Sequence, residues 1–183
     1  MKRGILVILL LILFATTART QSSQSHQVRI VIPKVALIDM ESAGSSAVVL
    51  SLDKPNEAGH GLQAAAQNSS GYWVNYSSVL ASGQPERKVM ASLSGNIPEG
   101  VKVLLVASPY SGEGKGKNGI PSGKKILSGE PTEIISNIGS CYTGNGVNNG
   151  HLLTFSLEVD EGKYEAIRHG DFENLRVTYT LTE

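Results

Sequence analysis

The stretch NLRVTYTLTE, residues 174–183, alternates between apolar and polar side chains. Successive side chains of a β-strand point to opposite faces of a sheet, so this alternation predicts a strand with one buried face. The apolar face consists of Leu175, Val177, Tyr179 and Leu181. Such a strand needs a neighbouring strand to satisfy its backbone hydrogen-bonding groups.

Short apolar or alternating segments recur from residue 27 onward, separated by clusters of Gly, Asn, Pro and Ser. This spacing is typical of an all-β sandwich or barrel, and we predict one antiparallel β-sandwich domain over residues 21–183. The predicted strands cover residues 27–32, 35–39, 47–52, 72–80, 87–93, 101–107, 124–127, 133–138, 151–159 and 175–181. VKVLLVA, residues 101–107, is apolar on both parities after Lys102 and predicts a central strand. The predicted core includes Val28, Ile30, Leu50, Leu52, Val103, Leu105, Leu153, Phe155, Leu157, Val177 and Tyr179.

One segment departs from the strand pattern: DEGKYEAIRHGD, residues 160–171. Asp160 is a favourable N-cap, and Gly170 is favourable just beyond a helix C-terminus. About two helical turns fit between them. We therefore expect a short helical corner that brings the final strand beside or across from residues 151–159.

Two segments are rich in turn-forming residues. SPYSGEGKGKNGIPSGKK, residues 108–125, predicts a mobile exposed loop because of its Gly, Lys and Ser content. SCYTGNGVNNG, residues 140–150, carries repeated Asn and Gly turn signals. We expect a protease to cut first within residues 111–122, since little there favours burial or regular pairing.

The N-terminus has the features of a secretory signal peptide. Lys2 and Arg3 precede an unbroken apolar run over residues 5–15. This run is too short for a membrane helix, which needs roughly 17 to 25 residues, but it suits a signal-peptide core of about 7 to 15. We predict a signal peptide over residues 1–20, a mature chain that starts near Gln21, and a secreted, periplasmic or cell-surface location.

Charge and cysteine content narrow the possible partners. Removing residues 1–20 lowers the sixteen basic residues by three to thirteen against sixteen acidic ones, so the mature net charge is about −3. Nucleic-acid binding requires clustered Lys and Arg on one face, so we expect no nucleic-acid partner. The single cysteine, Cys141, excludes an internal disulfide. We also expect no membrane span after signal cleavage.

No catalytic motif is complete, so we predict no enzymatic activity, no cofactor and no metal. GSCY, residues 139–142, resembles the nucleophile region of papain-like proteases, and His151 is the nearest base. Only 42 residues follow Cys141, whereas that family places its histidine roughly 130 to 150 residues downstream. Ser122 and Lys125 form an S-x-x-K match without the other motifs of serine β-lactamases. The acidic loops lack the D-x-D-x-D-G pattern of calcium sites.

SGYWVNYSSVL, residues 70–80, carries the only tryptophan. In a strand, Tyr72 and Tyr76 would share one face and Trp73 would lie on the other. An exposed Trp73 would suit stacking on a sugar, whereas a buried one would bridge two sheets. A secreted carbohydrate-binding module that uses Tyr72, Trp73 and Tyr76 is therefore an alternative function, with glycans as partners.

The chain as a whole resembles secreted bacterial fimbrial-type subunits and the related spore coat protein U group. The shared features are the signal peptide and the segments HQVRIVI, YEAIRHGDF and VTYTLT, which start at His26, Tyr164 and Val177. The resemblance implies an immunoglobulin-like sandwich that ends in an alternating strand. It also implies a non-enzymatic extracellular or cell-surface structural subunit or adhesin, whose partners are other copies of itself or surface-assembly proteins. Those subunits usually carry a cysteine pair and a penultimate Tyr, whereas this chain has one cysteine and Thr182.

The segment QVRIVI, residues 27–32, has two possible roles in this architecture. Val28, Ile30 and Ile32 share one parity, and Pro33 ends the run. We expect it to pair within its own sheet. The alternative is that it completes the sheet of a neighbouring copy, as donor strands do.

Overall fold

Strands dominate the residues that the computed structural model describes, which are 24–44, 48–65, 71–170 and 174–182. The strands are β1 (Val35–Ser42), β2 (Leu52–Asp53), β3 (Gln63–Ala64), β4 (Tyr72–Val79), β5 (Arg87–Ser94), β6 (Val101–Ala107), β7 (Lys115–Pro121), β8 (Lys125–Leu127), β9 (Thr132–Tyr142), β10 (His151–Val159) and β11 (Arg176–Leu181). Among these residues the one helical segment is a 3₁₀ helix, η1 (Glu161–Ala166), and no helix there is long and apolar enough to cross a membrane. The predicted signal peptide, residues 1–20, lies outside the described residues.

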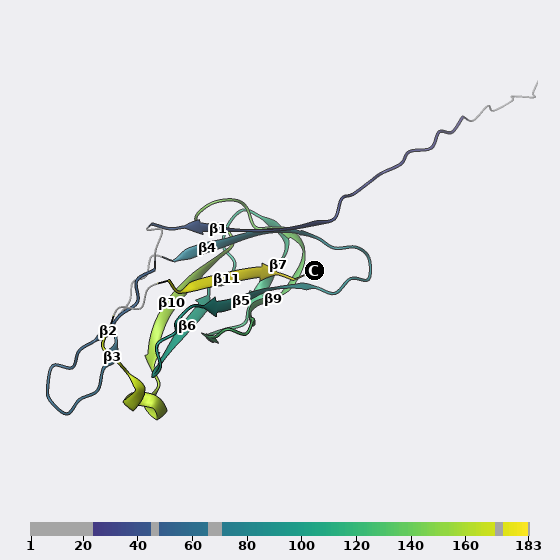
Figure 1. The fold of residues 1–183 in the computed structure, drawn as a ribbon. Helices are drawn as coiled ribbons and strands as arrows, with labels where there is room; N and C mark the ends of the chain where they lie inside the picture. Colours follow the sequence, from purple (N-terminus) through teal and green to yellow (C-terminus); the bar gives the residue numbers. More distant parts are fainter. Residues whose placement is uncertain (1–23, 45–47, 66–70, 171–173, 183) are drawn as a thin grey trace, which may run out of the picture. The chain divides into compact units, whose positions relative to one another are not determined.

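Nine of the strands form one antiparallel hydrogen-bonded network in the order β11-β5-β9-β4-β10-β6-β8, with β1 paired to β4 and β7 paired to β9. β4 and β9 share only the pairs Ser77 with Tyr142 and Ser78 with Cys141. The network therefore turns over at this corner into two layers, one with β1, β4, β10, β6 and β8 and the other with β11, β5, β9 and β7. Figure 1 shows β1 beside β4 and β11 beside β5. The predicted all-β antiparallel sandwich is confirmed.

Both layers supply one hydrophobic core, mainly through alternate residues of their strands; Ile134 and Ile135 of β9 are consecutive and both buried. The first layer contributes Val74, Tyr76, Val103, Leu105, Ala107, Leu127, Leu153 and Phe155. The second contributes Val89, Ala91, Leu93, Ile134, Ile135, Ile138, Cys141 and Leu181. Of the predicted core, Val103, Leu105, Leu153 and Phe155 are buried, whereas Leu50, Leu52, Leu157, Val177 and Tyr179 are partly buried.

Two strands occupy the positions that their sequence patterns predict. β6 lies between β10 and β8, which confirms the central strand. β11 pairs with β5 in the layer across from β10, with Val177 opposite Leu93 and Tyr179 opposite Ala91. The final strand therefore finds its partner in β5.

The predicted N-terminal strand is not formed. Residues 24–34 contain no strand, and Val28 and Ile30 are 73% and 82% exposed. The prediction that residues 27–32 pair within their own sheet, with Val28 and Ile30 in the core, is therefore wrong. Alternation defines a face, but a strand also needs an edge that takes its hydrogen bonds. The chain divides after Ile32 into two compact units, and the second unit, which begins at Pro33, contains all of the described strands.

The predicted loop over residues 108–125 contains a strand, β7, that pairs with β9. Its sequence KGKNGIP has little strand propensity, so the pairing depends on close contact between the two backbones. Gly116 has a φ of 97°, and a Cβ there would overlap the Ser140 carbonyl oxygen. Only glycine allows this approach, which explains a strand in a glycine-rich segment and removes the basis for expecting the first protease cut within residues 111–122.

Two further predictions need correction. In the described part of the predicted strand over residues 47–52, which is residues 48–52, only β2 forms, and its one partner among the described strands is β3. η1 is a 3₁₀ helix with a non-helical residue at Lys163, and the Asp160 side chain makes no capping hydrogen bond. The Tyr164 hydroxyl accepts a hydrogen bond from the Leu62 N–H at 3.1 Å, so η1 holds the residue directly before β3.

Candidate functional site

The three candidate glycan-binding residues lie on β4 but share no exposed surface. Tyr76 is 3% exposed and belongs to the core, and Tyr72 and Trp73 are partly buried. Tyr72 faces the core, while the register places Trp73 on the opposite face between Glu41 of β1 and Leu152 of β10. A ring must be exposed to stack on a sugar, so the burial of Tyr76 excludes it from such a site. Only Tyr72 and Trp73 keep exposed area, and they point in opposite directions.

A buried polar network surrounds His151, which is 0% exposed at the start of β10. Its Nδ1 lies 2.8 Å from the Ser108 carbonyl oxygen. Its Nε2 lies 2.9 Å from both the Tyr76 hydroxyl and the Asn118 carbonyl oxygen. The Tyr76 hydroxyl also donates to the Asn118 carbonyl, and the Tyr110 ring packs edge-on against the imidazole. The network joins β4, β7 and β10 to the loop after β6.

The protonation of Tyr76 suits a structural role for this network. Burial, followed by the nearby Cys141 and Tyr110, raises the pKa of Tyr76 well above its usual range. The phenol therefore remains protonated and donates its hydrogen bond at all ordinary pH values. Both ring nitrogens of His151 already lie within hydrogen-bonding distance of oxygen atoms of the protein. The arrangement is a cross-link between strands.

Cys141 and His151 do not form the nucleophile and base of a thiol hydrolase. Cys141 lies in β9 at 9% exposure, and His151 hydrogen-bonds to Tyr76 and to two backbone carbonyls. Burial raises the pKa of the Cys141 thiol to about 11, although the charge of Arg87 opposes the shift. A thiol nucleophile needs a lowered pKa, so the environment of Cys141 favours the inert, protonated form.

The raised pKa of Cys141 predicts a loss of stability at high pH. The folded thiol titrates near pH 11, whereas an unfolded one titrates near pH 8.5. The contribution of the buried, protonated thiol to the free energy of unfolding is therefore fully present below about pH 8.5 and is lost as the pH rises through about 11. Urea unfolding at pH 8 and pH 11 should show a fall in unfolding free energy that is about 2–3 kcal/mol larger for the native chain than for Cys141→Ala. Equal falls in the two proteins would contradict this assignment.

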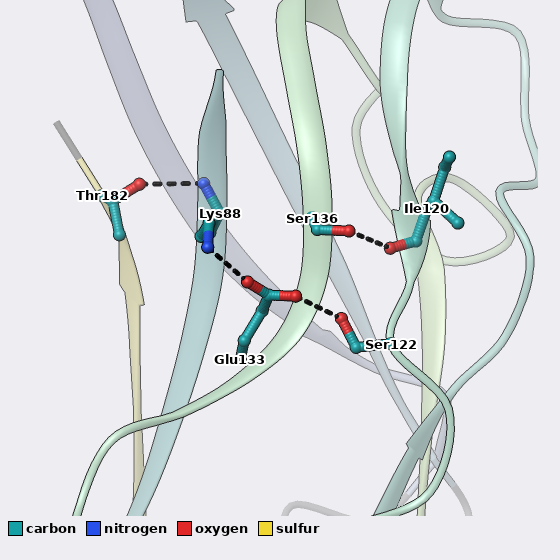
Figure 2. Close-up of polar contacts among 6 residues, drawn as sticks. All are labelled: Lys88, Ile120, Ser122, Glu133, Ser136 and Thr182. Carbon is teal, nitrogen blue, oxygen red and sulfur yellow. Dashed lines mark hydrogen bonds and ion pairs between the residues drawn. The ribbon is translucent and has the colours of Figure 1, made fainter. Parts of the chain in front are cut away.

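A surface cluster fastens the end of β11, as Figure 2 shows. The Thr182 hydroxyl accepts a hydrogen bond from the Lys88 N–H at 2.8 Å, and the Thr182 N–H donates to the Lys88 carbonyl at 2.9 Å. The Glu133 carboxylate lies 2.7 Å from the Lys88 ammonium and accepts from the Ser122 hydroxyl at 2.9 Å. These hydrogen bonds from Lys88 and Ser122, with the charge of Lys125, lower the pKa of Glu133. The cluster extends the β11–β5 ladder and gives Ser122 a carboxylate partner.

The first and last described strands, β1 and β11, each have one edge without a partner among the strands that the structure describes. Among the described strands, β1 pairs only with β4 and β11 pairs only with β5, and β1 and β11 lie close together. The core-facing side chains of both strands are only partly covered: Ala36, Ile38, Met40, Val177 and Tyr179. Unpaired edges of this kind are templates for a strand from another chain.

The segment before β1 carries the side chains that could cover these edges. Val28, Ile30 and Ile32 are 73%, 82% and 75% exposed. Exposed apolar residues are informative when they form a regular set, because scattered ones are common on any surface. The same residues that were predicted to form a strand therefore remain available for pairing.

The His151 network and the free edge of β1 were not predicted from the sequence. The partners of His151 include the backbone carbonyls of Ser108 and Asn118, which no side-chain pattern marks. One signal was present: His151 has the same parity as Leu153 and Phe155, the buried residues of β10. A histidine on an inward parity predicts a buried, hydrogen-bonded ring.

Comparison with known proteins identifies no relative: no family model, no curated protein and no solved structure matches the chain. The resemblance to fimbrial-type subunits therefore remains a prediction. In the described part of the chain, no group of three or more His, Cys, Asp or Glu side chains is placed to hold a metal ion.

Proposed function

We propose that the chain is a non-enzymatic structural subunit or adhesin of an extracellular or cell-surface assembly, in which the N-terminal segment of one copy completes the sheet of another. The observation that carries the proposal is the exposure of the alternating residues Val28, Ile30 and Ile32. The free edges of β1 and β11 supply the acceptor surface. A pairing strand contributes backbone hydrogen bonds and apolar burial together, which is how strand addition builds stable complexes.

The location in this proposal follows from the signal-like N-terminus. Lys2 and Arg3 followed by an apolar run of signal-peptide length support export to the periplasm, the cell surface or the medium. A chain with a single cysteine has no internal disulfide, so cross-strand pairing and core packing would stabilise the assembly outside the cytoplasm.

The proposal predicts that removal of residues 21–32 abolishes self-association without unfolding the sandwich. The mature chain should sediment as dimers or larger species, and the truncated chain should be monomeric with an unchanged β-rich circular dichroism spectrum. The truncated chain should also bind an added HQVRIVI peptide, because its acceptor edge is then empty. A scrambled peptide of the same composition is the control.

Two results would contradict the proposal. One is a mature chain that stays monomeric at every concentration tested. The other is a truncated chain that associates as well as the mature one. Either would show that the exposed segment does not mediate contacts between copies.

A further inference from the structure

The free edge of β1 has a defined hydrogen-bonding parity. The Ala43 N–H donates to the Gly71 carbonyl at 3.1 Å, which continues the β1–β4 register in which Val35 is opposite Val79. Odd-numbered residues of β1 therefore direct their backbone groups toward β4, and even-numbered residues direct theirs toward the free edge. In agreement, the Met40 N–H is used locally, in a 2.8 Å hydrogen bond to the carboxylate of Asp39.

The two faces of β1 differ in chemistry. Ala36, Ile38 and Met40 pack partly buried against the core, whereas Leu37 is 66% exposed and Asp39 is exposed on the other face. A strand added to this edge should therefore bring three apolar side chains to the inner face. On the outer face it should bring an apolar residue beside Leu37 and a cation beside Asp39.

Residues 27–32 meet all of these requirements in one antiparallel register. This register sets Ile32 opposite Ala36, Ile30 opposite Ile38 and Val28 opposite Met40 on the inner face. On the outer face it sets Val31 opposite Leu37 and Arg29 opposite Asp39. If the register is shifted by two residues, Arg29 lies opposite Leu37 in one direction, and Val31 lies opposite Asp39 in the other. Neither shifted register therefore keeps the two outer-face pairs. No parallel register makes both outer pairs at once.

The missing N–H of Pro33 also fits this register. Even-numbered residues of β1 carry the hydrogen-bonded pairs, so Pro33 opposite Val35 occupies a non-hydrogen-bonded pair. Proline is tolerated at such a position because no ladder bond is lost.

Turn chemistry disfavours the same pairing within one copy. The chain would have to reverse at Pro33, Lys34 and Val35, and a three-residue hairpin loop usually places a glycine in the left-handed region. Proline fixes φ near −65°, and a β-branched valine is unfavourable at positive φ. The sequence PKV suits a chain that continues in one direction, so the partner is a second copy.

Resting on the proposed function, we propose that residues 27–41 of two copies pair with each other as a two-fold symmetric antiparallel ribbon centred on Lys34. In the register above, the numbers of opposed residues always sum to 68, so residue 34 is opposite itself and both copies donate and receive. The pairing is therefore isologous and closes as a dimer. The edge of β11 stays available for further contacts.

The pair of Arg29 and Asp39 tests the register. Arg29→Asp should raise the dissociation constant of the dimer by about tenfold, because like charges then face each other at two symmetric positions. Asp39→Arg should have a similar effect, and the double exchange should restore the native value. Sedimentation equilibrium measures all four proteins, and Lys54→Asp, an exposed change outside the ribbon, is the control.

A cysteine at the symmetry axis supplies an independent readout. In a Cys141→Ala background, Lys34→Cys should form a disulfide-linked dimer on mild oxidation, since opposed Cα atoms of an antiparallel pair lie about 5.5 Å apart. Leu37→Cys in the same background should form no disulfide-linked dimer, because the register places Leu37 opposite Val31 and not opposite Leu37 of the second copy. If the mature chain associates but the charge exchange fails to rescue and the Lys34→Cys variant does not link, the register is wrong while the proposed function stands. A purely monomeric mature chain would overturn both.

Discussion

Replacing Gly150 with alanine is expected to destabilise the sandwich by about 3–5 kcal/mol, or to prevent folding, because two costs combine. Gly150 has a φ of 85°, a region that residues with a Cβ rarely adopt. A Cβ at this position would also overlap the backbone carbonyl oxygen of Val74 in β4. The backbone cannot retreat easily, since Gly150 forms two hydrogen bonds with Ser111, at 2.8 and 2.9 Å. Thermal or urea unfolding of the native and variant proteins measures the loss.

Gly146 in the same turn-rich segment provides a matched control. Its φ is 86°, but nothing lies within 4 Å of the position that a Cβ would take. Gly146→Ala should therefore cost only about 1 kcal/mol, the conformational part alone. Equal losses of unfolding free energy in the two variants would show that the close contact between Gly150 and β4 adds nothing to the cost of Gly150→Ala.

These glycines show what a sequence pattern can predict and what it cannot. Asn and Gly in residues 140–150 correctly predict turns, since positive φ is a local property. Contact between Gly150 and β4 depends on how distant strands meet, so no local signal marks it. The same limit explains β7, whose pairing depends on contact between Gly116 and β9.

Strands that carry their own burial signal were predictable. β6 and β10 match their predicted bounds, because a long apolar run and a clear alternation each identify a strand regardless of its partner. Residues 27–32 alternate equally well, yet they form no strand. Alternation predicts which face would be buried, whereas pairing depends on an available edge. Residues 27–32, which were wrongly predicted to pair within their own sheet, are therefore the same segment that is proposed to mediate assembly.

The candidate sites were less predictable than the fold. Trp73 and Tyr76 were singled out by residue type, but exposure decides whether a ring can bind a ligand, and Tyr76 proves to be buried. The buried polar network around His151, which includes Tyr76, depends on backbone carbonyls brought together by three strands and a loop. Backbone groups are the same at every residue, so composition and spacing cannot reveal them.

The second large effect is expected at His151. His151→Leu keeps a side chain of similar bulk but leaves the Ser108 carbonyl without its imidazole partner and removes the contacts to Tyr76 and Asn118. Unpaired buried polar groups cost about 1–3 kcal/mol each, so the variant should lose about 2–4 kcal/mol of unfolding free energy. Urea unfolding at neutral pH tests this value.

His60→Leu is the control for His151→Leu, because His60 is exposed in the segment between β2 and β3 and its loss should change stability by less than about 0.5 kcal/mol. A measurement of self-association distinguishes a role of the His151 network in stability from a role in the contact between copies. The His151 network lies in the core, whereas residues 27–41 carry the proposed ribbon, so folded His151→Leu should keep the native dissociation constant. A variant that is fully stable yet fails to associate would place His151 in the contact between copies and contradict the structural role that its buried hydrogen bonds indicate.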